Sequence, residues 1–291
     1  CTIVTSIPIL PKLTELSCEE CTALTSIPIL PKLEYLDCKY CTALTSIPVL
    51  PELRELFCSG CTSLTSIPVM GELIKLYCVE CTALKIIPVM GKLRELYCAD
   101  CTALTAIPVM AELETLNCAN MHFTSIPLFP KLEKLHCWNC TALTNILIRP
   151  ALKQLYCSGC TSLESISALP ELETPELKTL DCAYCTRLTS IPVMEKLITL
   201  FCVGCARLTS IPMLPKLQIL YCTDCTSLTD IPFMEELKDL DWRGCKWVSG
   251  CDEYDYNIKS LRTCQAIFKR KLTARKLEKL IPAIIEIYYS P

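Results

Sequence analysis

Ten Cys-x-x-Cys pairs recur along this chain of 291 residues, and paired thiols at that spacing are the side chains most suited to chemistry. Cys38/Cys41 and Cys58/Cys61 are typical, with sixteen residues between one pair and the next. Thiolates are good zinc ligands, and successive Cys-x-x-Cys pairs satisfy a common zinc-site pattern. The same cysteines could instead form disulfides, or they could pack as small apolar residues inside a repeat.

Two departures from the pattern favour packing. Met121 stands where one copy should have its second cysteine, and Trp242 stands where another should have its first. Both are apolar, and neither is a good zinc ligand. Cysteines stacked about 4.8 Å apart with parallel Cβ vectors would also fit disulfide geometry poorly. The odd total of 25 cysteines agrees with free thiols in a reducing compartment. We therefore expect core thiols, with no metal and no cofactor.

The cysteines belong to a 20-residue cassette that recurs about twelve times, as in CTALTSIPVLPELRELFCSG at 41–60. Such a period predicts a solenoid whose units bury their apolar faces by stacking on one another. Alternation within each copy predicts a short strand in which Leu56 and Cys58 point inward and Phe57 points outward. Two prolines in the return stretch TSIPVLPEL favour an extended, polyproline-like path and exclude a regular helix there.

Aligned on L-x-x-L-x-C-x-x-C-x-x-L, the cassette resembles a leucine-rich repeat; one copy supplies Leu53, Leu56, Cys58, Cys61 and Leu64. The expected fold is an α/β-class repeat solenoid that is mostly β. It has a parallel sheet of twelve strands on the concave face, a polyproline-like convex side and a helical C-terminal cap. The longer pattern I-P-x-L-P-x-L-x-x-L-x-C-x-x-C-x-x-L-T-S is similar to the 20-residue repeats of bacterial type III effectors.

A second resemblance concerns cysteine in place of asparagine and the tail FKRKLTARKLEKLIPAIIEIYYSP. Both features resemble leucine-rich-repeat proteins of giant amoeba-infecting DNA viruses. This resemblance implies a cytoplasmic location in an infected host cell, or a place in the virion. Some type III effectors are ubiquitin ligases with a Cys-x-Asp motif. Here Cys251 is followed by Asp252 and Glu253, so the motif does not match and that activity is not carried over.

The period ends near Cys245, which divides the chain into a solenoid at 1–245 and a tail at 246–291. The tail holds nine Lys or Arg against five Asp or Glu, whereas the solenoid holds 19 against 26. Apolar spacing predicts amphipathic helices at 257–271 and 273–289, which would cap the open edge of the last repeat. A second interpretation is that the basic residues at 269–271 and 275–276 dock on an acidic surface. No apolar run is long enough for a membrane span.

The register slips between about 118 and 184. Residues 121–139 form a copy of 19 residues, the copy at 140–159 reads NILIRP in place of the Ile-Pro element, and residues 160–184 form a copy of 25. Insertions in solenoids become bulges on one face. This bulge is either a binding feature or tolerated replication slippage.

Outward-facing strand residues are what a solenoid offers to a partner. In six of twelve copies the central outward position is Phe or Tyr, and contiguous exposed aromatic residues mark interfaces. The alternative is that these rings only stabilise the sheet through ladder contacts. The predicted partner-binding residues are Phe57, Tyr77, Tyr97, His136, Trp138, Tyr156, Phe201 and Tyr221. All hold the central outward position except Trp138, which lies two residues after His136. The most promising spot is Tyr77, Tyr97, His136, Trp138 and Tyr156.

Acidic residues on this face argue against a nucleic-acid partner, because they would repel phosphates; they are Glu15, Glu55, Glu80, Glu95 and Asp100. With only two histidines, no Ser-His-Asp set and no glycine-rich phosphate loop, the sequence also argues against an enzyme. The favoured function is a non-enzymatic module that binds a protein on its concave face. One alternative is a structural component of a virion or shell. Another is a fragment of an effector whose catalytic domain is absent.

Overall fold

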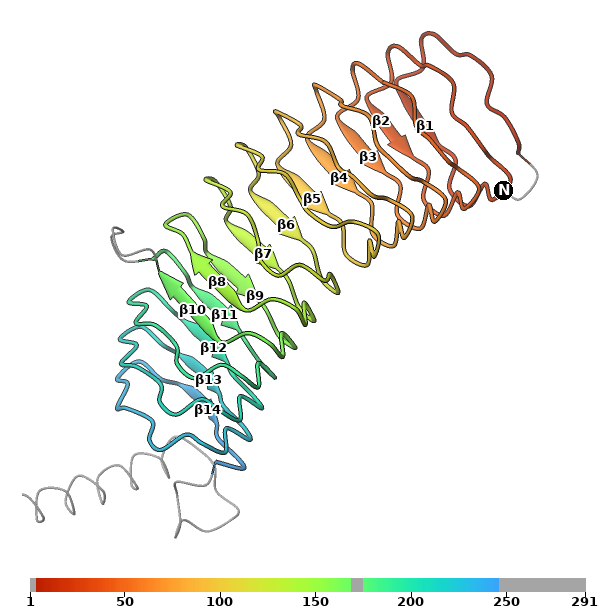
Figure 1. Ribbon diagram of the computed structural model, residues 1–291. Helices are drawn as coiled ribbons and strands as arrows, with labels where there is room; N and C mark the ends of the chain where they lie inside the picture. The colour runs from red at the N-terminus through yellow and green to blue at the C-terminus, as the bar shows by residue number, and fades with distance from the viewer. Residues whose placement is uncertain (1–3, 169–174, 246–291) are drawn as a thin grey trace, which may run out of the picture.

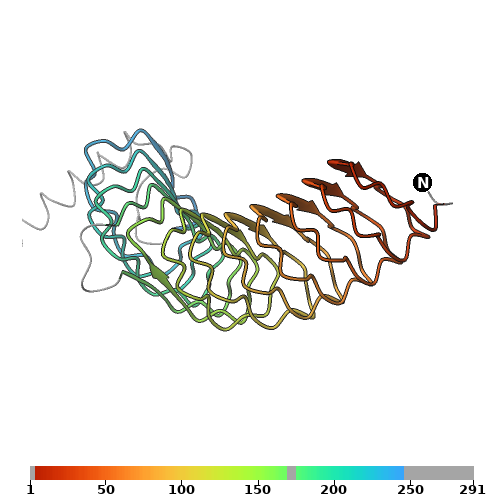
Figure 2. The same cartoon turned by 90° about the horizontal axis from the view of Figure 1, so that it is seen from above.

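Parallel strands, one from each repeat, form a sheet along the whole solenoid (Figure 1). The computed structural model describes residues 4–168 and 175–245. In spatial order the twelve strands are β1 (Glu15–Ser17), β2 (Tyr35–Asp37), β3 (Glu55–Phe57), β4 (Lys75–Tyr77), β5 (Glu95–Tyr97), β6 (Thr115–Asn117), β7 (Lys134–His136), β9 (Gln154–Tyr156), β11 (Thr179–Asp181), β12 (Thr199–Phe201), β13 (Ile219–Tyr221) and β14 (Asp239–Asp241). The predicted twelve-stranded parallel sheet is therefore confirmed. Figure 2 shows the coils following an arc, with the arrows of the first strands on its inner side.

The central leucine of each strand points into the solenoid, and the residue after it points out. Leu56 and Cys58 are fully buried, whereas Phe57 between them is half-buried on the outer side of the sheet. Register is in phase from strand to strand, so that Leu56 lies between Leu36 and Leu76. Each such leucine contributes roughly 1.5 to 3 kcal/mol through burial. The inward and outward assignment made from the alternation is confirmed.

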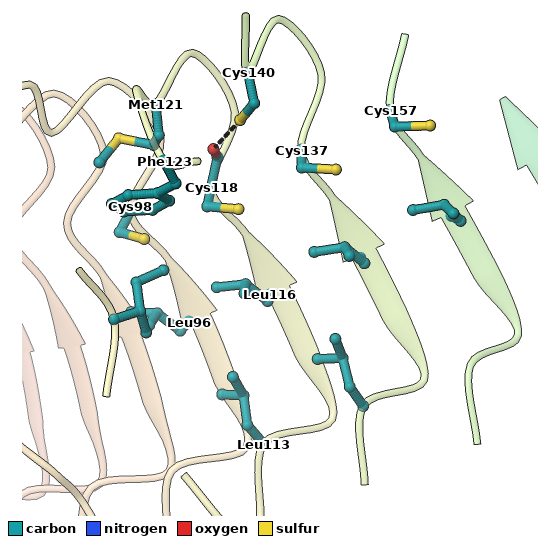
Figure 3. Packing of buried hydrophobic residues seen from close by; sticks show 14 of the residues in the cluster. Leu96, Cys98, Leu113, Leu116, Cys118, Met121, Phe123, Cys137, Cys140 and Cys157 are labelled. Carbon is teal, nitrogen blue, oxygen red and sulfur yellow. Dashed lines mark hydrogen bonds between the residues drawn. The ribbon is translucent and has the colours of Figure 1, made fainter. Parts of the chain in front are cut away.

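The cysteine columns pack inside the repeats. Of the 22 cysteines in the described residues, all are free thiols; Cys245 is partly exposed and the others are buried. The two substitutes, Met121 and Trp242, are each only 1% exposed, which confirms that these columns hold apolar residues. Figure 3 shows Met121 packed beside Phe123 and Cys98. Within the same residues no group of three or more His, Cys, Asp or Glu side chains is arranged to hold a metal ion.

The second cysteine of a pair also makes a hydrogen bond that was not predicted from the sequence. Its Sγ donates to the backbone carbonyl oxygen of the first cysteine one repeat earlier, over 3.1 Å from Cys61 to Cys38 and 2.9 Å from Cys101 to Cys78. The same contact recurs for Cys41, Cys81, Cys140, Cys160, Cys185, Cys205, Cys225 and Cys245. Met121 has no thiol hydrogen, so it cannot make this bond to Cys98.

A left-handed residue follows each strand, just before the second cysteine. Its φ lies between 55° and 74° in all twelve repeats, at Glu20, Tyr40, Gly60, Glu80, Asp100, Asn120, Asn139, Gly159, Tyr184, Gly204, Asp224 and Gly244. Glycine adopts this conformation without strain, and Asn and Asp tolerate it. A Cβ at Gly60 would lie 2.4 Å from the ring of Tyr40, so Tyr40 covers a position that only glycine leaves open.

The irregular copies build a small second sheet on the return side. Strands β8 (Asn145–Ile148) and β10 (Ser165–Ala168) pair in parallel, with Ile146 opposite Ile166. They occupy the two copies that lack the Ile-Pro element, because removing proline restores the backbone N–H that a strand needs. Other copies make only single bridges on this side, such as Ser26 to Ser46. Part of the predicted bulge, residues 169–174, lies outside the described residues.

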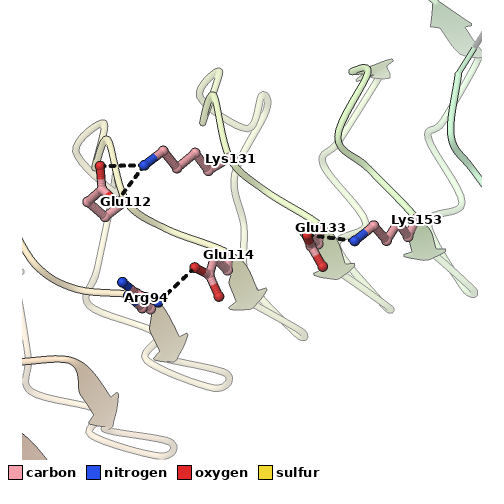
Figure 4. A network of polar contacts seen from close by, with 6 residues as sticks. All are labelled: Arg94, Glu112, Glu114, Lys131, Glu133 and Lys153. Atoms are coloured by element: carbon pink, nitrogen blue, oxygen red, sulfur yellow. Dashed lines mark hydrogen bonds and ion pairs between the residues drawn. The ribbon is translucent and has the colours of Figure 1, made fainter.

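Charged side chains at the edges of neighbouring repeats form ion pairs (Figure 4). Lys131 pairs with Glu112 at 2.7 Å, Lys153 with Glu133 at 2.6 Å, and Arg94 with Glu114 at 3.3 Å. All six side chains are 35% exposed or more, so each pair contributes only about 0 to 1 kcal/mol. Their main effect is to favour the register in which opposite charges face each other.

No helix occurs in the described residues, and none therefore could span a membrane there. This agrees with the extended return path predicted from the prolines, and the helical part of the predicted fold class has no counterpart in these residues. The predicted helical cap and basic tail at 246–291 lie outside the described residues. The domain boundary at 245 stays a prediction.

Candidate protein-binding surface

The last residues of the twelve strands form one continuous column across the outer side of the sheet. Strand pairing places them in register in the order Ser17, Asp37, Phe57, Tyr77, Tyr97, Asn117, His136, Tyr156, Asp181, Phe201, Tyr221 and Asp241. Seven of the eight predicted binding residues belong to this column. Trp138 lies two residues beyond His136. We call the twelve in-register strand residues, together with Trp138, the outward column.

The first group of rings stacks across three strands. Ring centroids of Phe57 and Tyr77 are 4.7 Å apart, and those of Tyr77 and Tyr97 are 4.3 Å apart with only 8° between their planes. Tyr35 adds a tilted contact to Phe57 at 5.4 Å. The rings are half-buried, because each covers a face of the next. Burial and a hydrogen bond from its hydroxyl to Glu95, at 3.0 Å, raise the pKa of Tyr77 above its ordinary value.

Two smaller groups follow. His136 stacks on Tyr156 at 4.6 Å, and Trp138 meets His136 edge-on at 5.4 Å. Burial lowers the pKa of His136, and the nearby positive charge of Lys134 lowers it further, so the ring is neutral at pH 7. Phe201 and Tyr221 lie 5.2 Å apart in a tilted arrangement.

Polar residues separate these groups. Asn117 stands between Tyr97 and His136, and Asp181 stands between Tyr156 and Phe201. Each side-chain oxygen accepts a hydrogen bond from the backbone N–H two residues later, at 3.2 Å from Ala119 and 3.1 Å from Ala183. The most promising spot predicted from the sequence is thus divided: Tyr77 and Tyr97 belong to one stack, and His136, Trp138 and Tyr156 to another.

Charge gathers at the N-terminal end of the column. Lys39 lies 2.8 Å from Glu19 and 3.0 Å from Asp37, and its ammonium group is 5.7 Å from the centroid of the Phe57 ring. Along the whole column, the left-handed turn residues that follow the strands include Glu20, Glu80, Asp100 and Asp224 but no Lys or Arg. The rim of the sheet on that side is therefore acidic.

A row of exposed apolar residues on the return side was not among the sequence-based predictions. The residue after each Ile-Pro proline is between 49% and 74% exposed in ten copies: Ile9, Ile29, Val49, Val69, Val89, Val109, Leu128, Val193, Met213 and Phe233. The sequence shows that an apolar residue recurs at this position, but the structure is needed to show that it faces outward.

Solved structures of leucine-rich repeat proteins are similar to this chain. A leucine-rich repeat protein from Eubacterium ventriosum superposes with a TM-score of 0.50 and 17% identity, covering 84% of this chain and 81% of that one. The protein has the leucine-rich-repeat fold. A leucine-rich repeat protein from Bacteroides ovatus gives a TM-score of 0.40 at 20% identity, covering 79% of each chain. YopM from Yersinia enterocolitica gives 0.39 at 19% identity, covering 83% of this chain and 67% of that one.

No protein-family model matches the chain, and no curated protein matches it. One feature of this chain within the fold is the contact between repeats made by the second cysteine of a pair. Its thiol donates a hydrogen bond to a backbone carbonyl oxygen of the preceding repeat, as Cys61 does to Cys38.

Proposed function

We propose that this protein is a non-enzymatic module that binds a protein partner through the outward column. The observation that carries the proposal is the stack of Phe57, Tyr77 and Tyr97, in which three rings lie side by side on an open sheet face. Rings that stack on one another hold each other in place, so the row of ring edges they present loses little side-chain entropy on binding; Tyr and Trp are enriched in interfaces for the same reason. Sheet stability alone does not require rings at successive positions, since Asn117 and Asp181 hold the same place in other repeats.

The chemistry of the face indicates the kind of partner. Acidic side chains such as Glu95 and Asp100 lie along the rings, and the described solenoid is acidic overall. An arginine side chain fits the end of this stack, because its guanidinium could lie on the face of Tyr97 next to Asn117 and pair with carboxylates. We propose a partner segment that carries arginine and aromatic or aliphatic residues. The acidic rim argues against a nucleic acid.

The setting we propose is a reducing compartment such as the cytoplasm, and it is supported by the cysteines that fill the core as free thiols. A viral origin and docking of the basic tail on an acidic surface are part of the same proposal. Their support is the sequence resemblance and the charge of residues 246–291.

Selection from a displayed peptide library tests the proposal. Wild-type protein should enrich peptides with arginine next to aromatic residues. The variant Tyr77→Ala/Tyr97→Ala/Tyr156→Ala should lose their binding by orders of magnitude, because buried aromatic anchors at interfaces contribute about 2 kcal/mol or more each. The matched control is Val69→Ser/Val89→Ser/Val109→Ser, which removes three exposed apolar residues from the return side and should bind normally. Loss of binding in the control alone would move the site to the return side.

A further inference from the structure

Arg149 breaks the pattern of the core. Its backbone carbonyl accepts a hydrogen bond from Leu152 at 3.2 Å, just as the carbonyl of Phe129 accepts one from Leu132 in the repeat before. Arg149 therefore occupies a column that other repeats fill with buried apolar side chains, namely Leu30, Leu50, Met70, Met90, Met110, Phe129, Met194, Leu214 and Met234. It is itself only 9% exposed. A charge thus replaces an apolar residue in the interior of the solenoid.

The guanidinium of Arg149 is only partly satisfied by the protein. One terminal nitrogen donates to the carbonyl oxygen of Phe129 at 2.9 Å, and the other to that of Pro127 at 3.1 Å. In the part of the chain that the structure describes, Nε is buried without a hydrogen-bond partner and no carboxylate pairs with the side chain. Burial lowers the pKa of Arg149 to about 10, so the group is still charged at neutral pH. A buried cation without a counter-charge is unfavourable, and an anion that reached it would bind strongly.

A cavity of about 160 Å³ lies beside this charge. Arg149 is part of its wall, and most of the remaining wall is apolar, including Ile126, Leu132, Leu135 and Ile146. An apolar cavity of about 150 Å³ is known to hold one benzene molecule. The cavity opens where the copy of 19 residues meets the copy that lacks the Ile-Pro element, so the irregular repeats create it.

We propose that this cavity binds a small monocarboxylate with an apolar body of about six carbon atoms, such as hexanoate or benzoate. The body would fill the apolar space, and the carboxylate would accept hydrogen bonds from Arg149. Guanidinium and carboxylate match in planar geometry, and their charge-assisted hydrogen bonds are the strong ones. The proposal is independent of the outward column, because the cavity is lined from the return segments and the interior.

Calorimetric titration with sodium hexanoate, against the uncharged 1-hexanol, tests both halves of the proposal. Wild-type protein should bind hexanoate at least tenfold more tightly than hexanol, and hexanoate should raise its Tm in a concentration-dependent way. The variant Arg149→Met introduces the side chain that this column carries at Met110 and Met194 and so should fold. It should lose the preference, with the two affinities differing less than twofold.

Two further variants keep the test decisive. Ile126→Phe places a ring in the cavity while leaving Arg149 in place, and it should weaken both probes at least tenfold. Glu171→Gln/Glu173→Gln removes the acids nearest in sequence beyond β10, and its affinity for hexanoate should equal that of wild type.

Several results would overturn the inference. These are equal affinity of wild type for hexanoate and hexanol, no binding of either, or a preference that survives Arg149→Met. A rise in Tm with sodium phosphate as large as with hexanoate would show that the apolar body of the ligand contributes nothing to binding, which would refute that part of the proposal. A tenfold gain in hexanoate affinity for Glu171→Gln/Glu173→Gln would mean that the chain's own acids already neutralise Arg149.

Discussion

The thiol of Cys61 donates a hydrogen bond to the backbone carbonyl oxygen of Cys38, with 3.1 Å between sulfur and oxygen. The bond joins two neighbouring repeats inside the core, where water cannot replace it. Cysteine therefore does two things at this position: it fills a small apolar space, and it gives the carbonyl of Cys38 a second hydrogen bond beside the one from the N–H of Cys41. The first cysteine of each pair has the packing role, and its own carbonyl is the acceptor.

The first prediction uses serine substitutions at Cys61 and Cys98 to separate hydrogen-bond donation from apolar packing. Cys61→Ser keeps a hydrogen-bond donor for the carbonyl of Cys38, whereas Cys61→Ala removes it and should lower the free energy of unfolding by about 0.5 to 1.5 kcal/mol. Cys98→Ser should cost more than Cys61→Ser, because Cys98 sits among apolar side chains and burial raises the pKa of its thiol. Urea denaturation of the three variants gives the order. Equal costs for Cys61→Ser and Cys98→Ser would refute the division of roles.

The inward and outward faces of one strand provide the second prediction. Leu96 is fully buried, and Leu96→Ala should destabilise the protein by about 2 to 5 kcal/mol through the cavity it leaves. Its neighbour Tyr97 lies on the outward column, so Tyr97→Ala should cost only about 0.5 to 1.5 kcal/mol, the value of a lost ring stack. Both variants are compared by urea denaturation. A larger cost for Tyr97→Ala would contradict the assignment of faces.

The sequence predicted the sheet because one apolar pattern recurs about twelve times. The apolar residues of each copy are buried only if side chains such as Leu56 and Cys58 point into the solenoid. The sequence also placed the predicted binding residues on one face, because successive side chains of a strand point to opposite faces of the sheet. The grouping of the rings could not be predicted, because it depends on side-chain rotamers and on where Asn117 and Asp181 interrupt the column.

Three other features were hidden for different physical reasons. The thiol of Cys61 could not be assigned a donor role, since cysteine reads as apolar in any pattern. The left-handed turn was obscured because Tyr40 and Glu80 stand where glycine stands elsewhere. Arg149 fell in a copy whose register had slipped, so that its equivalence to Phe129 emerged only from the backbone hydrogen bonds.

The third prediction concerns the contact between Tyr40 and Gly60. Gly60→Ala should be destabilising for two reasons: its φ of 73° disfavours any Cβ, and that Cβ would lie 2.4 Å from the Tyr40 ring. The first part should be about 1 to 2 kcal/mol. In a Tyr40→Gly background only the first part remains, so Gly60→Ala should then cost less. A double-mutant cycle by chemical denaturation measures the difference, and strict additivity would rule out the steric part.

The last prediction concerns pH. Burial, reinforced by Lys134, lowers the pKa of His136 below its ordinary value of 6.5 in the folded protein. The unfolded chain therefore takes up this proton first as the pH falls. Stability from His136 is fully present above pH 6.5 and is lost as the pH drops through the lower, folded pKa. Protonation would also place a charge inside the stack with Tyr156.

NMR titration of the His136 ring checks this directly, with His122→Asn used to assign the two histidine signals. The folded midpoint should lie below pH 6.5, and His136→Phe should reduce the loss of stability as the pH falls below 6.5. Asp181, whose pKa burial raises, works in the opposite direction, because it favours the protonated state. The His136→Phe comparison cancels that contribution, since Asp181 is present in both proteins. A His136 midpoint at or above 6.5 would show that its ring is solvated rather than stacked.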